Sequence, residues 1–177
     1  MKKYLVLVLA VLMVAALTTG ALAGPAGKSN VGHLYLFEKD ADWVIVDGGA
    51  WGKMKYNLSG EDFEFVFNGH GLDPESNYCL IYYPDPWPGN GLICLAEGTP
   101  NRGGNLHLRA SSDTGDLPAE WDQNHPSNQP DGTTIYGAKI WLVLSSDVSH
   151  TDQKMIGWHL GEYLFEGEGI FFKNTDD

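Results

Sequence analysis

The run Tyr78-Cys79-Leu80-Ile81-Tyr82-Tyr83 is followed by the turn-rich stretch Pro84-Asp85-Pro86-Trp87-Pro88-Gly89-Asn90-Gly91 and then by the run Leu92-Ile93-Cys94-Leu95-Ala96. Two apolar runs joined by a segment rich in Pro and Gly predict a β-hairpin. Neither run alternates with polar residues, which is typical of strands that are covered on both faces in the middle of a sheet. We therefore expect this hairpin to lie in the core of the fold.

The hairpin carries both cysteines of the chain, Cys79 and Cys94. A turn centred between Pro86 and Trp87 places them opposite each other, at a distance that a disulfide can span. A register slip of one residue would separate them. Two alternatives follow: a structural disulfide formed in an oxidising compartment, or two buried thiols.

Further strand-like runs lie on both sides of the hairpin. Met54, Tyr56 and Leu58 alternate with polar residues, and this period of two indicates a strand with one buried face. The same alternation occurs at the phenylalanines of residues 63–67. The expected strands are 33–37, 43–46, 52–58, 63–67, 138–144, 169–172 and one through Leu106 and Leu108.

The chain contains 22 Gly and 9 Pro in 177 residues, which favours short strands and turns over long helices. Turn-forming segments separate the strand-like runs at short intervals, the spacing of a β-sandwich. We predict an all-β, antiparallel, immunoglobulin-like β-sandwich, with an antiparallel β-barrel as the alternative. The polar stretch 111–137 interrupts this spacing, so we expect it to be a long loop, of the kind that often binds ligands.

Three segments carry a resemblance to a known group of proteins: residues 72–78, 82–89 and 137–147. Together they resemble exported, functionally uncharacterised immunoglobulin-like β-sandwich domains of archaea and bacteria. The resemblance implies the sandwich architecture and an exported location. It brings no catalytic residues to this chain.

The N-terminal segment has the pattern of a secretory signal peptide. Lys2 and Lys3 precede an apolar run, and Ala21-Leu22-Ala23 forms a small-residue cleavage pattern before Gly24. The apolar run is shorter than the roughly 20 residues that span a membrane. We expect a signal peptide at 1–23 cleaved between Ala23 and Gly24, a flexible leader at 24–32, one sandwich domain at 33–173 and an acidic tail at 174–177.

The charge of the chain excludes one class of partner. Its 23 acidic residues outnumber 11 basic ones, for a formal net charge of −12. Phosphate backbones are repelled by such a protein, so we expect no nucleic acid partner. With the signal peptide removed, we also expect no membrane span. The predicted location is secreted, extracellular or at the cell surface.

Aromatic residues give the strongest indication of a ligand. Trp87 lies between two prolines at the predicted hairpin tip, where its ring has little core to pack against. Tyr83, Asp85 and Asn90 lie close to it in sequence and could contact a sugar stacked on the indole. Trp121 in the long loop could contribute as well. The alternative is that Trp87 folds back over the tyrosines and caps the sandwich.

Metal-binding patterns are sparse in this sequence. Calcium prefers oxygen ligands from loops, which makes Asp113, Asp116 and Asp131 candidate ligands; the alternative is a solvated acidic surface. No zinc motif occurs, although a sandwich fold could bring His70 and His107 together. We expect no cofactor other than such a calcium ion.

No pattern in the chain marks a catalytic centre. It has no Gly-x-Ser-x-Gly motif, and both cysteines lie in apolar strands where a thiol is inert. We therefore favour a non-catalytic binding or structural module that binds carbohydrate through the aromatic tip. The alternatives are a protein interaction module using the same tip, a structural calcium-binding domain, or a metal-dependent secreted enzyme.

Overall fold

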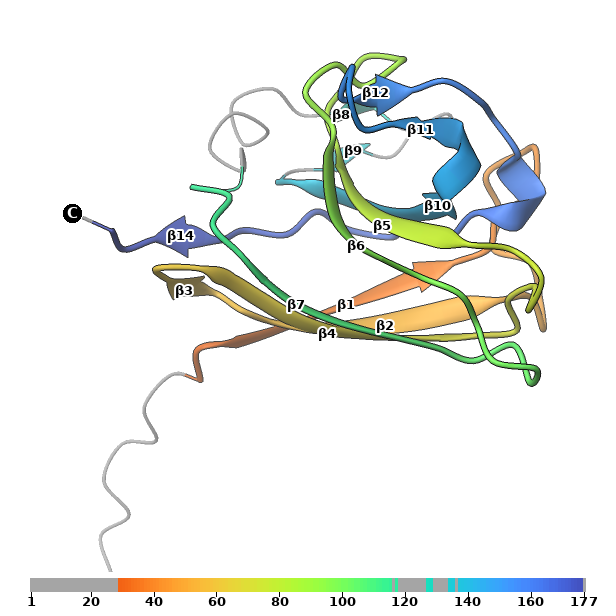
Figure 1. The fold of residues 1–177 in the computed structure, drawn as a ribbon, viewed down its shortest axis with the longest axis horizontal. Helices are drawn as coiled ribbons and strands as arrows, with labels where there is room; N and C mark the ends of the chain where they lie inside the picture. Colours follow the sequence, from red (N-terminus) through yellow and green to blue (C-terminus); the bar gives the residue numbers. More distant parts are fainter. Residues whose placement is uncertain (1–28, 116, 118–126, 129–133, 136, 177) are drawn as a thin grey trace, which may run out of the picture.

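The computed structural model describes residues 29–115, 117, 127–128, 134–135 and 137–176. Two antiparallel sheets face each other in these residues, and Figure 1 shows them as two layers. The predicted β-sandwich is confirmed. The barrel alternative is wrong, because the adjacent strands β6 (Ile93–Gly98) and β7 (Leu106–Ser112) belong to different sheets.

The larger layer has five strands in the order β13-β1-β2-β4-β7. Side chains of β1, β2 and β4 alternate between buried and exposed, because successive residues of a strand point to opposite faces. The inward set packs against the smaller sheet, and the outward set forms an open surface. The bounds of its other strands are β1 (Val31–Phe37), β2 (Trp51–Asn57), β4 (Phe63–His70) and β13 (Phe165–Glu166).

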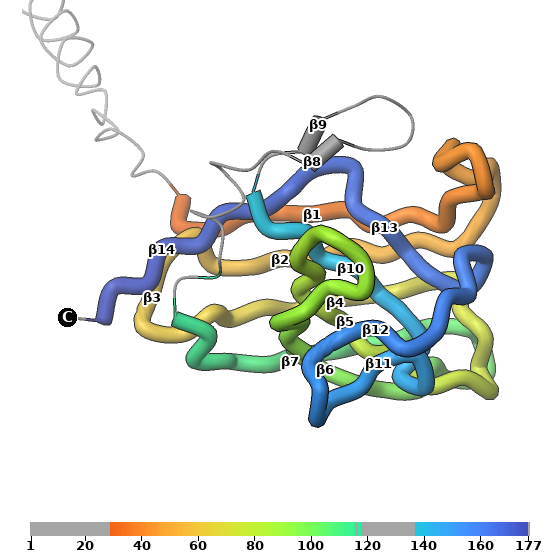
Figure 2. The backbone as a smooth tube through the Cα atoms, turned by 90° about the horizontal axis from the view of Figure 1, so that it is seen from above, coloured from red at the N-terminus to blue at the C-terminus, as the bar shows by residue number. Residues whose placement is uncertain are grey.

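The smaller layer has three strands in the order β10-β5-β6, namely β10 (Lys139–Leu144), β5 (Tyr78–Tyr83) and β6. Every residue of β5 and β10 is buried, as their apolar sequences predict. Seen from above in Figure 2, this layer lies over the strands of the larger one. The segment after Tyr163 joins the layers, because Leu164 pairs with β10 while Phe165 and Glu166 pair with β1.

Short elements complete the described residues. β11 (Val148–Ser149) and β12 (Lys154–Met155) form a small hairpin, and β14 (Lys173–Asn174) pairs in parallel with β3 (Ser59–Gly60). β8 (Ser127–Asn128) pairs with β9 (Thr134–Ile135). Two single turns of 3₁₀ helix are η1 (Ser145–Asp147) and η2 (Leu160–Glu162). In the part of the chain that is described, no helix has the length and apolarity needed to cross a bilayer.

The sandwich begins and ends a few residues away from the domain boundaries predicted from the sequence, 33–173. β1 begins at Val31, inside the expected leader, and Asn30 donates a hydrogen bond of 2.7 Å to the Ser59 carbonyl. Asn174 belongs to β14 and not to a tail. The predicted signal peptide and its cleavage position at Ala23 and Gly24 lie outside the described residues.

Two predicted strands are wrong. Residues 43–46 make only an isolated bridge, between Ile45 and Lys39, and they begin in a turn in which Asp40 Oδ1 accepts the backbone N–H groups of Asp42 and Val44 at 2.9 and 3.0 Å. This side chain satisfies backbone groups that would otherwise pair in a ladder. Trp43 adopts φ 62° within that turn. Residues 169–172 make only an isolated bridge, between Ile170 and Ala138.

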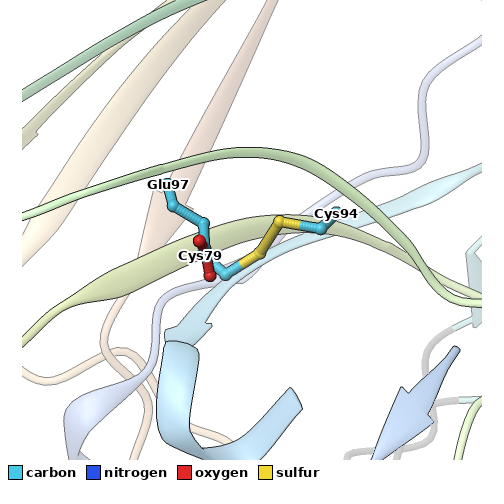
Figure 3. A group of neighbouring side chains, drawn as sticks. All are labelled: Cys79, Cys94 and Glu97. Atoms are coloured by element: carbon cyan, nitrogen blue, oxygen red, sulfur yellow. A yellow bond between two sulfur atoms is a disulfide. The ribbon is translucent and has the colours of Figure 1, made fainter. Parts of the chain in front are cut away.

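The cysteines form a disulfide, although the predicted register is wrong. Cys79 pairs with Glu97 and Cys94 pairs with Ile81, because a bulge between Leu80 and Ile81 adds one residue to β6. The two cysteines are therefore diagonal neighbours with Cα atoms 6.3 Å apart, within the range that a disulfide spans. Figure 3 shows the bridge beside Glu97. It ties the second residue of β5 to the second residue of β6.

Candidate functional site

Trp87 occupies the loop between β5 and β6 and is 53% exposed. Backbone hydrogen bonds hold this loop against the β11–β12 hairpin: Gly91 and Leu92 donate to the Gln153 carbonyl at 2.9 and 3.0 Å, and Met155 donates to the Pro88 carbonyl at 2.8 Å. The position of Trp87 is therefore fixed by a second loop that lies more than 60 residues later in the chain. In Figure 2 the β11–β12 hairpin lies beside the loop.

A second exposed indole, Trp158, lies next to Trp87. It is 41% exposed, and the ring centroids of the two are 5.6 Å apart at an angle of 87°. Trp158 also contacts three buried rings, those of Trp141, Tyr163 and Phe165, at centroid distances of 6.1, 5.5 and 5.9 Å. Trp158 thus packs on the rings of Trp141, Tyr163 and Phe165, which we call the aromatic floor, and Trp87 packs on Trp158. We call Trp87 and Trp158 the tryptophan pair.

Tyr83 is not part of this surface, so the prediction for it is wrong. It is 3% exposed and stacks on Trp141 with ring centroids 3.8 Å apart. Burial, assisted by the charge of Asp85, raises the pKa of its hydroxyl to about 12. Tyr83 supports the floor because β5 is covered on both faces.

Asp85 and Asn90 lie on either side of Trp87 in the sequence of the β5–β6 loop. Asp85 Oδ2 lies 2.5 Å from Nζ of the buried Lys139, an ion pair that joins the loop to β10. Its side chain is 39% exposed, which leaves part of the carboxylate accessible. Asn90 is exposed. Both side chains of the loop are therefore at least partly accessible to solvent.

Sequence reasoning missed a polar cluster beneath Trp158. Asp147, 4% exposed, accepts a hydrogen bond at 2.6 Å from Nδ1 of His159 and a second one from the Tyr163 hydroxyl through the same oxygen, Oδ2. The hydrogen bond with Asp147 raises the pKa of His159, and the carboxylate charge adds to the effect. Burial and the same hydrogen bond raise the pKa of Tyr163. No motif joins these residues in sequence, because the β11–β12 hairpin separates Asp147 from His159.

The cluster places a polar group at the edge of the tryptophan pair. His159 follows Trp158 in the chain, and its side chain is 54% exposed. Its Nδ1 is engaged by Asp147, so Nε2 is the ring nitrogen left to contact a ligand. Within the described residues Nε2 has no hydrogen-bond partner. A charged imidazole donates at both nitrogens.

A buried group of charges lies behind the aromatic floor. Glu166 is 1% exposed, and Lys39 donates to its backbone carbonyl at 3.1 Å. Burial raises the pKa of the Glu166 carboxyl to about 7, against the opposing charges of Lys139 and Lys39. Its Oε2 and the indole Nε1 of Trp141 find no hydrogen-bond partner among the described residues. Glu166 belongs to β13 of the larger sheet and Trp141 to β10 of the smaller one, and the ring of Trp141 also packs against Trp158 of the tryptophan pair.

The predicted calcium ligands are only partly described. Asp113 is exposed and accepts a hydrogen bond at 3.4 Å from the Gly115 N–H of its own turn. Asp116 and Asp131 lie outside the described residues, as does Trp121. The arrangement of this proposed site therefore stays a prediction.

In the part of the chain that is described, histidines and cysteines form no complete set of metal ligands. His70 and His107 lie on the outer face of the larger sheet, but each Nδ1 pairs with an asparagine oxygen at 2.8 Å. The one group of ligand atoms within 4.8 Å of one another comprises Cys79, Cys94 and Glu97. Both of its sulfur atoms are joined in the disulfide of Figure 3, which leaves no thiolate to bind a metal.

Comparison with known proteins gives no further identification. No family model matches the sequence, and no curated protein or solved structure shows significant similarity to it.

Proposed function

We propose that this protein is an exported, non-catalytic module that binds carbohydrate at the tryptophan pair. The observation that carries the proposal is the adjacency of Trp87 and Trp158, two exposed indoles of which Trp158 packs on buried rings. Exposed aromatic rings of this size mark binding surfaces, because leaving them in water is unfavourable. Carbohydrate fits them because the apolar face of a pyranose packs on an indole.

Polar groups around the pair suit sugar hydroxyls. Asp85 accepts hydrogen bonds, Asn90 both donates and accepts, and Nε2 of His159 completes the set on the Trp158 side. The loop of Trp87 is pinned by three backbone hydrogen bonds to residues 153 and 155. A ligand therefore meets a surface that is already ordered, which lowers the entropic cost of binding.

Export rests on the N-terminal sequence and on the disulfide. Residues 1–23 have the three-part pattern of a signal peptide, and bridged cysteines persist in oxidising compartments. The resemblance to exported immunoglobulin-like domains implies the same location. Mass spectrometry of the protein recovered from its host tests this point, with a mature N-terminus at Gly24 as the expected result.

Glycan binding is tested with the purified protein on a glycan array and by pull-down with insoluble cellulose, chitin and xylan. Trp87→Ala and Trp158→Ala are compared with Phe171→Ala, since Phe171 is an exposed aromatic residue, at 41%, outside the pair. We expect either indole substitution to weaken binding at least about tenfold, as for an anchor residue, and the control to bind as wild type.

Two results would overturn the proposal. One is a wild-type protein that binds none of these glycans. The other is a Trp87→Ala or Trp158→Ala variant that keeps both its near-ultraviolet circular dichroism and its full affinity. Capture of a protein partner by the same two indoles would support the interaction module instead.

A further inference from the structure

The outer face of the five-stranded sheet carries ordered rows of side chains unrelated to the tryptophan pair. Strand register places Phe37 beside Trp51 and Trp51 beside His70 in one row. The row after it holds Tyr35, Lys53, Asn68 and His107, and the next holds His33, Lys55, Val66 and Arg109. The first and third rows are four residues apart along β2, roughly 13 Å.

Charge on this face opposes the charge of the whole chain. The protein has a formal charge of −12, yet the outward positions of β1, β2, β4 and β7 carry three cations and only one carboxylate, Glu64. The cations are Lys53, Lys55 and Arg109. Neither Lys55 nor Arg109 makes an ion pair with any described residue. Three of the six histidines, His33, His70 and His107, share the face.

Exposed rings lie among these cations. Tyr35 and Trp51 are 43% and 40% exposed. The ring of Trp51 lies 4.6 Å from that of His70, and Nζ of Lys53 lies 5.2 Å from the centroid of Tyr35. The rings are thus held by neighbouring side chains while part of each faces solvent.

The cationic end of the face is hollowed. A depression of about 480 Å³ is lined there by Lys55, Val66, Arg109 and Glu64, together with flanking residues of the same strands. Asparagine oxygens fix the imidazoles of His70 and His107 elsewhere on the face, at 2.8 Å each. The face therefore combines a recess, unpaired positive charge and aromatic rings.

We infer that this face is a second binding site, and that its ligand is an acidic polysaccharide, a sugar chain bearing carboxylate or sulfate groups. Its anionic groups pair with Lys55 and Arg109, while pyranose rings pack on Trp51 and Tyr35. A single glycan chain lies within the face and stays clear of the acidic remainder of the surface. The site is independent of the tryptophan pair, because it lies on the other layer of the sandwich (Figure 1).

The test is isothermal titration calorimetry of the purified protein with polygalacturonate, heparin and dextran at low ionic strength. Polygalacturonate and heparin separate a carboxylate from a sulfate requirement, and dextran is the neutral control. We expect binding to at least one acidic polymer, a loss of at least tenfold in the double variant K55Q/R109Q, and weaker binding by Trp51→Ala. Added salt is expected to weaken the complex, because exposed ion pairs are screened.

Matched variants make the result specific to this face. Lys154→Gln combined with Lys173→Gln removes two positive charges from other strands, and we expect it to bind as wild type. Glu64→Gln removes the one carboxylate of the face and is expected to tighten binding several-fold. Trp87→Ala is expected to leave acidic polymer binding unchanged, which separates this inference from the proposed function.

Three outcomes would overturn the inference. The first is no binding to either acidic polymer. The second is equal loss of affinity in K55Q/R109Q and in the Lys154 and Lys173 control, which would indicate a general effect of charge. The third is equally tight binding of single-stranded oligothymidylate with no effect of Trp51→Ala, which would indicate attraction of any polyanion.

Discussion

Nδ1 of His159 lies 2.6 Å from Oδ2 of the buried Asp147, and the same oxygen accepts the hydrogen bond of the Tyr163 hydroxyl. Asp147 lies in η1, His159 lies in the segment after β12, and Tyr163 lies just before the segment that joins the two layers. The carboxylate of Asp147 therefore holds these three parts of the chain together. Because His159 follows Trp158, this contact also fixes the segment that presents the second indole of the tryptophan pair.

The contact between His159 and Asp147 predicts a dependence of stability on pH. The pKa of His159 is raised in the folded protein, so the fold favours the protonated imidazole. The stabilisation is complete at low pH and is lost as pH rises through the raised pKa. We expect the difference in unfolding free energy between wild type and His159→Gln to be larger at about pH 5 than at about pH 9. Urea unfolding at both values measures it, and an unchanged difference contradicts the prediction.

Gly157 lies against the same carboxylate and tolerates no side chain. A Cβ at this position would lie 2.1 Å from Asp147 Oδ1. Gly157→Ala is expected to lower the unfolding free energy by about 1–3 kcal/mol. The carboxylate of Asp147 is buried and accepts two hydrogen bonds, so it has no room to shift away from the added methyl group. The matched control is Gly161→Ala, whose Cβ would meet no atom within 4 Å. Equal thermal midpoints for the two variants would contradict the prediction, because they would show that the Asp147 side chain moves aside at little cost.

Glu166 predicts a second pH effect of the same sign. Its pKa is about 7 in the fold, above the 4.5 of a solvated glutamate, because burial disfavours its charge. Below about pH 4.5 the carboxyl is neutral in both the folded and the unfolded protein. As the pH rises from about 4.5 to about 7, the unfolding free energy falls by about 3 kcal/mol, because only the unfolded chain releases the proton easily. Glu166→Gln is expected to flatten this slope in urea unfolding. Glu168→Gln, at an exposed position of the same segment, serves as control and should keep the wild-type slope.

The disulfide predicts a redox-dependent stability. It closes a loop of 15 residues between strands β5 and β6. A cross-link that closes a loop of this size restricts the unfolded chain and stabilises the folded protein by about 3 kcal/mol. Reduction of the disulfide should therefore lower the unfolding free energy by about that amount. Urea unfolding with and without dithiothreitol measures the change. The double variant C79A/C94A should show no response to the reductant, and a response of similar size there would assign the effect to something else.

The strands predicted correctly from the sequence are those in which the order of polar and apolar residues indicates which side chains are buried. Alternation in residues 52–58 and 63–67 and unbroken apolarity in residues 78–83 all correspond to strands in the described structure. Residues 43–46 misled the prediction, because their β-forming side chains are outweighed by the hydrogen bonds of Asp40. A local polar contact of this kind leaves no periodic signal.

The candidate site was predicted only where one residue sufficed to indicate it. Trp87 between two prolines indicated an exposed ring, and it is exposed. Tyr83 was placed wrongly although it ends the unbroken apolar run 78–83, which itself predicts burial, and in the structure it stacks on Trp141 of β10. Trp158, His159 and Asp147 gave no signal, since Trp158 meets Trp87 from a loop far along the chain and His159 meets Asp147 across the β11–β12 hairpin.

Local pattern alone determined the all-β class, the hairpin around Trp87 and the possibility of a bridge between Cys79 and Cys94, because strand period and turn composition are properties of neighbouring residues. Tertiary structure decided which side chains meet. The bulge set the true register of the cysteines, the β11–β12 hairpin fixed the loop of Trp87, and sheet order gathered Lys55 and Arg109 on one face. Such contacts depend on how strands pair and layers pack, and spacing along the chain does not encode them.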